Sequence, residues 1–239
     1  MKWLEEYQVD SHDLDYNRVA RASSLVRFMQ EAANSQCRNM GPSLEDLRDK
    51  QGLAFLLSRF SAGFYDTVFA YERLTVETFG VESRGFSFHR CYRILRGDTV
   101  VAEACAVWGL IDIESRRPVR VSEYKPGFEY DQMLTLDVPT RIVFPATAPM
   151  KLVGEHTVSY GETDFNMHMN NTRYSDMLCD TVDMKGKRIY RMSLNFLNEA
   201  KIGENLNIYS TQHGEDVFFR TVRTDGKTNV EAQITFGEI

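Results

Sequence analysis

The chain has 239 residues, of which 43% are hydrophobic and 26% charged, as is ordinary for a globular protein with its own core. Its net charge of −6 argues against non-specific binding to nucleic acid. The first residues lack the apolar run of a signal peptide, and no stretch reaches the length of a transmembrane helix. The four cysteines show no metal-binding spacing, so we expect reduced thiols in a cytoplasmic protein, with no metal and no cofactor.

The first half of the sequence predicts a short strand, two helices and a run of strands. Apolar residues recur at helical spacing over residues 23–39, and Gly41-Pro42-Ser43 ends this helix and can cap a short one over 44–50. Long strands that follow one helix indicate an antiparallel sheet with the helix packed on it, an α+β fold. The strands expected in this half are 5–10, 54–64, 73–82, 85–95 and 99–113.

A proline-rich segment follows. Residues 118–150 hold five of the six prolines, and proline cannot donate to a sheet ladder, so we expect an extended connector outside the sheet. The second half then repeats the order of the first, with a helix over 171–182 and strands over 151–160, 188–197, 205–212, 216–223 and 229–236. We therefore divide the chain into an N-terminal half (1–117), the connector (118–150) and a C-terminal half (151–239).

The two halves also share residues. The offset is 149 in the loop and helix, as from Asp15 to Asp164, and 132 in the sheet, as from Arg59 to Arg191. The repeat fails at two positions that carry chemistry. Val19 and Thr67 of the first half stand where His168 and Glu199 stand in the second. A purely structural motif would need no such asymmetry, so we expect the second half to hold the chemistry and the first to supply shape.

The most informative stretch runs from Asp164 to Asn170, where every second residue is polar. A period of two places Asp164, Asn166 and His168 on one side of an extended segment. Asn170 or Asn171 then offers a helix N-cap, and free N–H groups at a helix start can stabilise an oxyanion. Because Asp and Asn also cap helices without any catalytic role, this spacing alone leaves a structural role open.

Taken with the repeat, these residues resemble the acyl-[acyl-carrier-protein] thioesterases of the plant and bacterial type. The resemblance covers about residues 9–236 and implies two tandem hotdog halves, each an antiparallel sheet wrapped on a central helix. It also implies hydrolysis of fatty acyl thioesters in fatty acid biosynthesis. The family signature, Asp-x-Asn-x-His-x-Asn-Asn-x-x-Tyr with a glutamate in the next strand, is met by Asp164, Asn166, His168, Asn170, Asn171, Tyr174 and Glu199.

One departure from the family bears on the mechanism. Many plant members place a cysteine directly after the glutamate, where this chain has Ala200. We therefore expect direct attack by water rather than an acyl-enzyme. His168 or Glu199 would act as the base, Asn166 would position the water or the thioester carbonyl, and Asp164 would orient its neighbours. The N–H groups at the helix start would form the oxyanion hole.

The resemblance also implies a pocket and a partner. The acyl chain would lie between helix and sheet of the first half, although ordinary core is the alternative for most of the residues expected to line it: Leu25, Phe28, Met29, Phe55, Leu57 and Trp108. The acyl-carrier protein is acidic and would need a basic patch, unless the cations form only a solvated face. The candidate docking residues are Lys185, Lys187, Arg188 and Arg191.

Two other functions remain open. An acyl-CoA thioesterase would use the same chemistry on a different carrier, and the sequence separates the two only weakly. A non-catalytic acyl-binding module would use the pocket alone, but the gain of His168 and Glu199 in one half argues against it. Tandem halves can pack against each other within one chain, so we expect either a monomer or a homodimer.

Overall fold

The computed structural model describes residues 1–146 and 148–239 and shows an α+β protein. The longer helices are α1 (Ala22–Met40), α2 (Leu44–Gln51) and α3 (Arg173–Cys179). The short 3-10 helices are η1 (Ser11–Asp13), η2 (Val121–Glu123) and η3 (Tyr160–Glu162). The strands are β1 (Trp3–Gln8), β2 (Leu53–Phe64), β3 (Arg73–Arg84), β4 (Ser87–Arg96), β5 (Thr99–Asp112), β6 (Lys151–Thr157), β7 (Lys187–Phe196), β8 (Asn205–His213), β9 (Asp216–Arg223) and β10 (Thr228–Glu238). Each expected strand is present with ends within three residues of the prediction.

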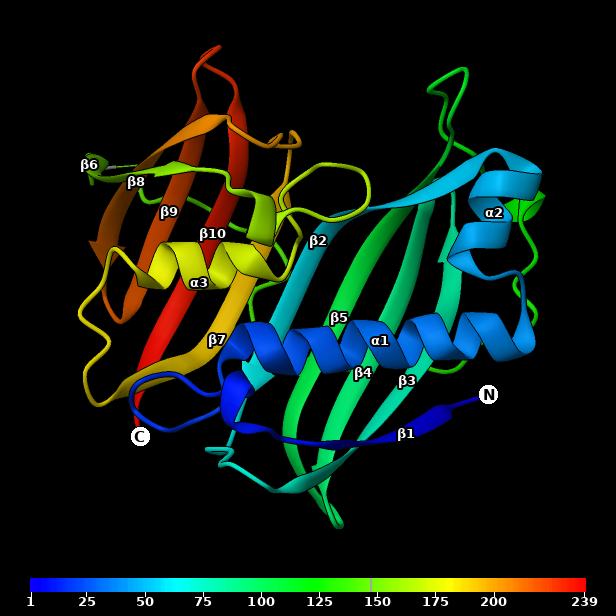
Figure 1. Cartoon of the computed structure of the whole chain (residues 1–239), viewed down its shortest axis with the longest axis horizontal. Helices are drawn as coiled ribbons and strands as arrows, with labels where there is room; N and C mark the ends of the chain where they lie inside the picture. Colours follow the sequence, from blue (N-terminus) through cyan, green and yellow to red (C-terminus); the bar gives the residue numbers. More distant parts are fainter. Residues whose placement is uncertain (147) are drawn as a thin grey trace.

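The strands form one continuous antiparallel sheet whose order is β1-β3-β4-β5-β2-β7-β10-β9-β8-β6 (Figure 1). The first five strands belong to the first half and the last five to the second, in mirrored order, so the repeat predicted from sequence is present in the topology. The halves join where β2 pairs with β7. Ser61 pairs there with Ser193, its own counterpart at the offset of 132, and their hydroxyls are 3.2 Å apart. This pair therefore marks a pseudo-two-fold axis between the halves.

Helix α1 covers one face of the first-half sheet, crossing its strands (Figure 1). The helix-spaced residues Phe28, Met29 and Ala32 are fully or almost fully buried against the sheet. On β3 the alternating residues Leu74 and Val76 are buried in the same core. The wrapped helix and curved sheet agree with the predicted hotdog arrangement, although the two sheets are joined edge to edge into one.

Helix α3 is shorter than the predicted helix over 171–182. Its start is delayed because the Asn170 side chain accepts hydrogen bonds from the Thr172 N–H (3.0 Å) and hydroxyl (2.8 Å). Its end comes early because Thr181 and Val182 donate their backbone N–H groups to carbonyls three residues back. Bonds of this tighter spacing close a helix end rather than extend it.

The connector leaves β5 and packs on the first half. Its Leu134 covers a small cluster on the outer face of the sheet, formed by Phe79, Val81 and Cys91. Beneath it Cys91 and Cys105 lie opposite each other on β4 and β5 with sulfurs 2.7 Å apart, and all four cysteines are free thiols. In the described part of the chain no helix is long and apolar enough to cross a membrane.

Candidate active site

The predicted extended segment is in fact a tight turn, so the prediction of an extended backbone is wrong, although Asp164, Asn166 and His168 are half-buried while the apolar residues between them are exposed. Asp164 donates its N–H to the His168 carbonyl (2.9 Å) and accepts one from Met167 through its own carbonyl (2.9 Å). The Asp164 carboxylate accepts the Asn166 N–H at 2.8 Å, a local bond that favours a turn over a strand. Phe165 and Met167 are 75% and 68% exposed, and both border the same cavity as Asn166 and His168.

The turn places His168 against Glu199. His168 Nε2 lies 3.3 Å from Glu199 Oε2. The contact is fixed by backbone pairing: His168 bridges Lys201, and the neighbouring Met169 donates its N–H to the Ala200 carbonyl at 2.8 Å. The side chains are 23% and 45% exposed, so water can reach both groups. Sequence reasoning expected both residues in the site, and the fold brings them together.

The amide of Asn166 is held from two sides. Its Nδ2 donates to Asp164 Oδ2 at 3.4 Å, and its Oδ1 accepts a hydrogen bond from Arg48 on α2. The Arg48 guanidinium also lies 5.4 Å from the centroid of the Phe165 ring, a cation–π arrangement. Sequence reasoning missed Arg48, because an exposed cation on a short amphipathic helix carries no signal of a partner 118 residues away.

The predicted oxyanion donors differ in availability. The Asn170 N–H is occupied by the Glu162 carbonyl at 2.8 Å, and the Asn170 side chain caps Thr172. The Asn171 N–H has no acceptor among the described residues. Tyr174 of the signature is buried, and its hydroxyl accepts a hydrogen bond from Asn229 at 3.0 Å. Asn171 is thus the better placed of the two predicted donors, and Tyr174 is structural.

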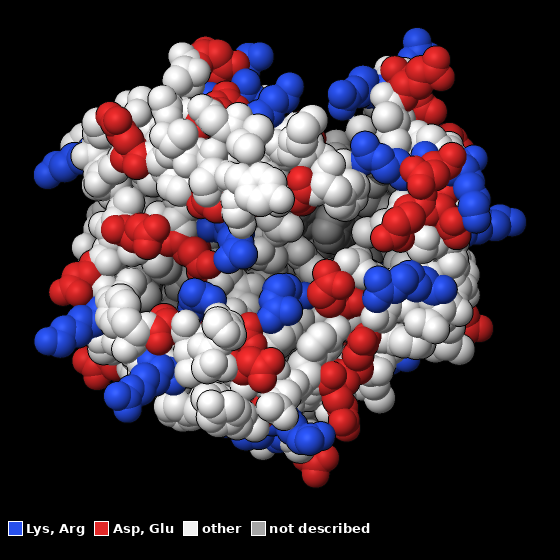
Figure 2. Space-filling model, viewed as in Figure 1, with Lys and Arg blue, Asp and Glu red and all other residues white. Residues whose placement is uncertain are grey.

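Two cavities adjoin at this turn. The larger, of about 490 Å³, runs between α2, the start of β2 and the turn, and holds the polar side chains Arg48, Arg116, His168, Glu199 and Lys201. The smaller, of about 350 Å³, lies between α1 and the first-half sheet and reaches Asp164, Asn170 and Asn171. Phe165 and Asn166 line both cavities. Figure 2 shows this face of the molecule hollowed between the two halves, with charged side chains around the hollow.

The residues expected to line an acyl pocket fall into two groups. Phe55 and Trp108 line the smaller cavity. The others are packed into the main core, which was the alternative prediction for them: Leu25, Phe28, Met29 and Leu57. Sequence pattern could not separate the groups, because a cavity wall and a filled core need the same apolar residue types.

The first half contains the same turn but lacks the His–Glu pair. Asp15 accepts the Asn17 N–H at 2.8 Å, and Arg18 has a φ of 66°, close to the 62° of Met167 at the matching position. Where the second half has its His168–Glu199 pair, Val19 is buried and faces a cavity of only about 20 Å³ that Thr67 also lines.

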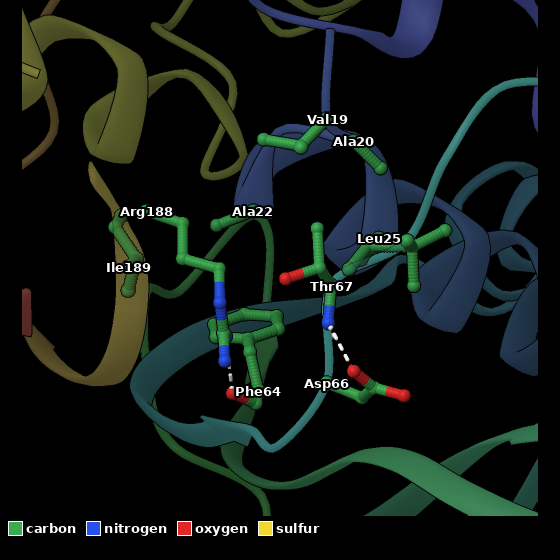
Figure 3. A pocket seen from close by; sticks show the side chains of 10 residues that line it. Val19, Ala20, Ala22, Leu25, Phe64, Asp66, Thr67, Arg188 and Ile189 are labelled. Atoms are coloured by element: carbon green, nitrogen blue, oxygen red, sulfur yellow. Dashed lines mark hydrogen bonds between the residues drawn. The ribbon is translucent and has the colours of Figure 1, made fainter. Parts of the chain in front are cut away.

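This small cavity is closed from the other half (Figure 3). Arg188 reaches across it from β7 and donates a hydrogen bond to the Phe64 carbonyl at 2.6 Å. The first copy is therefore filled by side chains, while the second copy opens to a cavity more than twenty times larger.

The predicted docking residues lie beside this filled copy. Lys185 precedes β7, and Lys187 and Arg188 are its first two residues. Glu199 comes only after the ten residues of this strand, which span roughly 30 Å. Burial lowers the pKa of Arg188. Arg191 lies 3.8 Å from the Asp137 carboxylate. The structure thus places this basic set away from both large cavities, and its docking role stays a prediction.

No cysteine of the described chain reaches the pair. Ala200 stands directly after Glu199, is fully buried, and accepts the Met169 N–H through its carbonyl. Cys179 lies on α3, where burial raises the pKa of its thiol to about 12. A thiol with such a pKa supplies almost no thiolate near neutral pH, so Cys179 is unsuited to nucleophilic attack.

Comparison with known families identifies relatives for nearly the whole chain. Residues 1–124 match the family model described as the acyl-ACP thioesterase N-terminal domain, and residues 149–238 match the acyl-ACP thioesterase C-terminal domain. A curated relative is the chloroplastic palmitoyl-acyl carrier protein thioesterase of Gossypium hirsutum, which is 19% identical over 98% of this chain. The match spans 57% of that relative's length.

Solved structures of similar fold cover both halves at once. An acyl-ACP thioesterase from Bacteroides thetaiotaomicron superposes with a TM-score of 0.88 at 18% identity, over 99% of this chain and 98% of that one. The 12:0-ACP thioesterase of Umbellularia californica gives a TM-score of 0.77 at 15% identity, over 100% of this chain and 98% of that one. These likenesses confirm the predicted tandem fold.

Proposed function

Because the chain belongs to the acyl-ACP thioesterase family, we propose that it hydrolyses fatty acyl groups held as thioesters on the phosphopantetheine arm of an acyl-carrier protein. The observation that carries this proposal is the position of the His168–Glu199 pair beside the turn where two cavities adjoin. A thioester at that turn would have its acyl chain on one side and its carrier arm on the other.

The smaller cavity suits the acyl chain. It is lined by aromatic residues of the first half, among them Phe55, Phe88 and Trp108, and it is continuous with the turn through Phe165 and Asn166. The larger cavity suits the carrier arm, because its cations Arg48, Arg116 and Lys201 complement a phosphodiester. This arrangement uses both halves of the chain for a single substrate.

The reaction follows from the groups at the turn. His168 or Glu199 would take a proton from water as the water oxygen attacks the thioester carbonyl carbon. The Asn166 amide would orient the water or the carbonyl, held by Asp164 and Arg48. The Asn171 N–H is a candidate donor to the oxyanion. Collapse of the intermediate breaks the carbon–sulfur bond, and the departing pantetheine thiolate takes up a proton.

This proposal is tested by thiol release from a panel of acyl-carrier-protein and acyl-CoA thioesters. We expect turnover of the carrier-bound substrates. Turnover of CoA esters alone would support thioester hydrolysis but would identify the protein as an acyl-CoA thioesterase. No turnover of either, together with binding of fatty acid, would favour a non-catalytic acyl-binding module.

A further inference from the structure

The connector lines the far end of the smaller cavity, beside Gly80 and Ser83 of β3. The cavity begins at the turn and extends beneath α1 to Gly80 on β3. In the strand order β2-β5-β4-β3 this is three interstrand spacings, or about 14 Å. The connector residues that line the cavity are Tyr124, Pro126, Phe128 and Tyr130.

These connector residues are seated on the first half by specific contacts. Tyr124 packs edge-on against Phe55 and Phe88, with ring centroids 5.6 and 5.7 Å apart. Asp131 donates its backbone N–H to the Gly80 carbonyl at 2.9 Å. Gly127 passes so close to the C-terminal end of α1 that a Cβ there would lie 1.5 Å from the Met40 carbonyl oxygen. The connector is therefore fixed to both walls of the cavity, the sheet and the helix.

Phe128 occupies the end position itself. A Cβ on Gly80 would lie 2.8 Å from the Phe128 ring, so the glycine makes room for this side chain. The ring is also held by Arg90, whose guanidinium lies 5.1 Å from its centroid. Next to it, Tyr130 remains 39% exposed. Phe128 itself is only partly buried, so this end wall lies near the surface of the molecule.

We propose that the connector segment 124–130, with Phe128 as its main residue, limits the length of the acyl chain that the enzyme accepts. This inference rests on the proposed thioester hydrolysis and on placement of the acyl chain in the smaller cavity. An apolar pocket discriminates chains that differ by a methylene about 10-fold or more when the pocket ends at a fixed wall. Removing the Phe128 ring lengthens the cavity at this end, so longer chains can be accepted.

The test uses Phe128→Ala and wild-type protein with saturated acyl-carrier-protein substrates graded in chain length. We expect the preferred length to increase, with the ratio of kcat/KM for the longer substrate over the wild-type optimum rising about 10-fold or more. Phe69→Ala is the matched control, because it removes the same ring from an exposed site outside both large cavities. Its chain-length preference should equal that of wild type.

A second variant gives the opposite expectation. Cys37 lines the same cavity from α1, and Cys37→Leu adds volume there, so the preferred length should decrease. Unchanged preference in Phe128→Ala, with hydrolysis retained, would overturn the role of the connector whatever Cys37→Leu shows, and would leave the proposed function intact. Absence of hydrolysis by the wild-type protein would overturn the proposed function and this inference with it.

Discussion

Asn17 and Asn166 hold the same position in two copies of one turn, but the fold uses their amides differently. Asn17 Nδ2 donates to the Met184 carbonyl at 2.7 Å, and its Oδ1 accepts the Gly186 N–H at 3.0 Å. Asn17 thus ties the first half to the loop before β7. The amide of Asn166 contacts only Asp164 and Arg48 within the described chain and borders both cavities. One copy of the motif serves structure, and we propose that the other serves the substrate.

This contrast predicts opposite effects of one substitution. Asn17→Ala should lower the free energy of unfolding by about 1–3 kcal/mol, because it leaves backbone groups of the loop before β7 without a partner. Its kcat should stay near that of wild type. Asn166→Ala should keep its stability and lose kcat on the order of 10²-fold, as expected for a group that orients the reacting carbonyl or water. Urea unfolding and steady-state kinetics on the two variants check this, and loss of activity in Asn17→Ala alone would contradict it.

Arg48 is predicted to act on the reaction through Asn166. Arg48→Ala should lower kcat about 10-fold, since a misplaced amide loses roughly one hydrogen bond of transition-state stabilisation. Arg48→Lys should restore only part of the rate, because a lysine lacks the planar fork that can meet both the amide and the Phe165 ring.

Lys50→Ala is the matched control for Arg48, since Lys50 is a cation on the same helix that pairs with Asp46 and lines neither large cavity. Both alanine variants should unfold within about 0.5 kcal/mol of wild type, as surface substitutions do. An equal loss of kcat in the two would show that α2 acts as a whole and that Arg48 has no specific role.

Replacing Asp176 on α3 by asparagine should raise the stability of the fold in a pH-dependent way. Burial raises the pKa of its carboxyl, only partly opposed by Ser23, Arg21 and Arg173. A carboxyl whose pKa is higher in the folded state destabilises the fold once it ionises, an effect absent below the unfolded pKa near 3.9 and complete above the folded pKa. Asp176→Asn should therefore be more stable than wild type at neutral pH, and the difference should vanish by about pH 4.

Urea midpoints across this pH range measure the effect. Glu6→Gln, which neutralises an exposed carboxylate on β1, should show no comparable gain. A lower midpoint for Asp176→Asn at neutral pH would mean that its hydrogen bond with Ser23 outweighs burial.

Carrier docking can be tested at two sites. The cations Arg116 and Lys201 line the larger cavity, whereas Lys185 and Lys187 are exposed near the filled copy of the turn. We expect charge reversal of Arg116 and Lys201 to raise KM for the carrier-bound substrate about 10-fold. The KM for a small thioester should not change, because only the carrier-bound substrate brings an acidic protein. The same result from reversing Lys185 and Lys187 instead would place docking where the sequence predicted it. Arg188 is unsuited to this test because its guanidinium holds the Phe64 carbonyl.

Sequence pattern predicted the helix and strand order well because each element carries a local period. The burial of Phe28 and Met29 on α1, and of Leu74 and Val76 on β3, follows from spacing alone. The turn at Asp164 was missed because a period of two also arises in a loop whose side chains bond to its own backbone. The end of α3 was missed for a similar reason: Thr181 bonds its hydroxyl back to the Leu178 carbonyl at 2.8 Å.

Contacts between distant segments could not be predicted from one sequence. The repeat and the family resemblance together located His168 and Glu199, and the fold brings them to 3.3 Å. Nothing local to Arg48 or Phe128 indicates that the first reaches Asn166 or that the second ends a cavity. Both depend on how the halves and the connector meet, which is set by packing across the whole chain.

We assign thioester hydrolysis to the His168–Glu199 pair. This assignment is tested most directly by kcat on acyl-carrier-protein substrate for wild type, His168→Ala, Glu199→Ala and the double variant, with folding checked by circular dichroism. We expect each single variant to lose about 10²–10⁴-fold in kcat. The double variant should lose little more than the less active of the two single variants, because the two groups act as a unit. Full activity in both single variants would contradict the assignment.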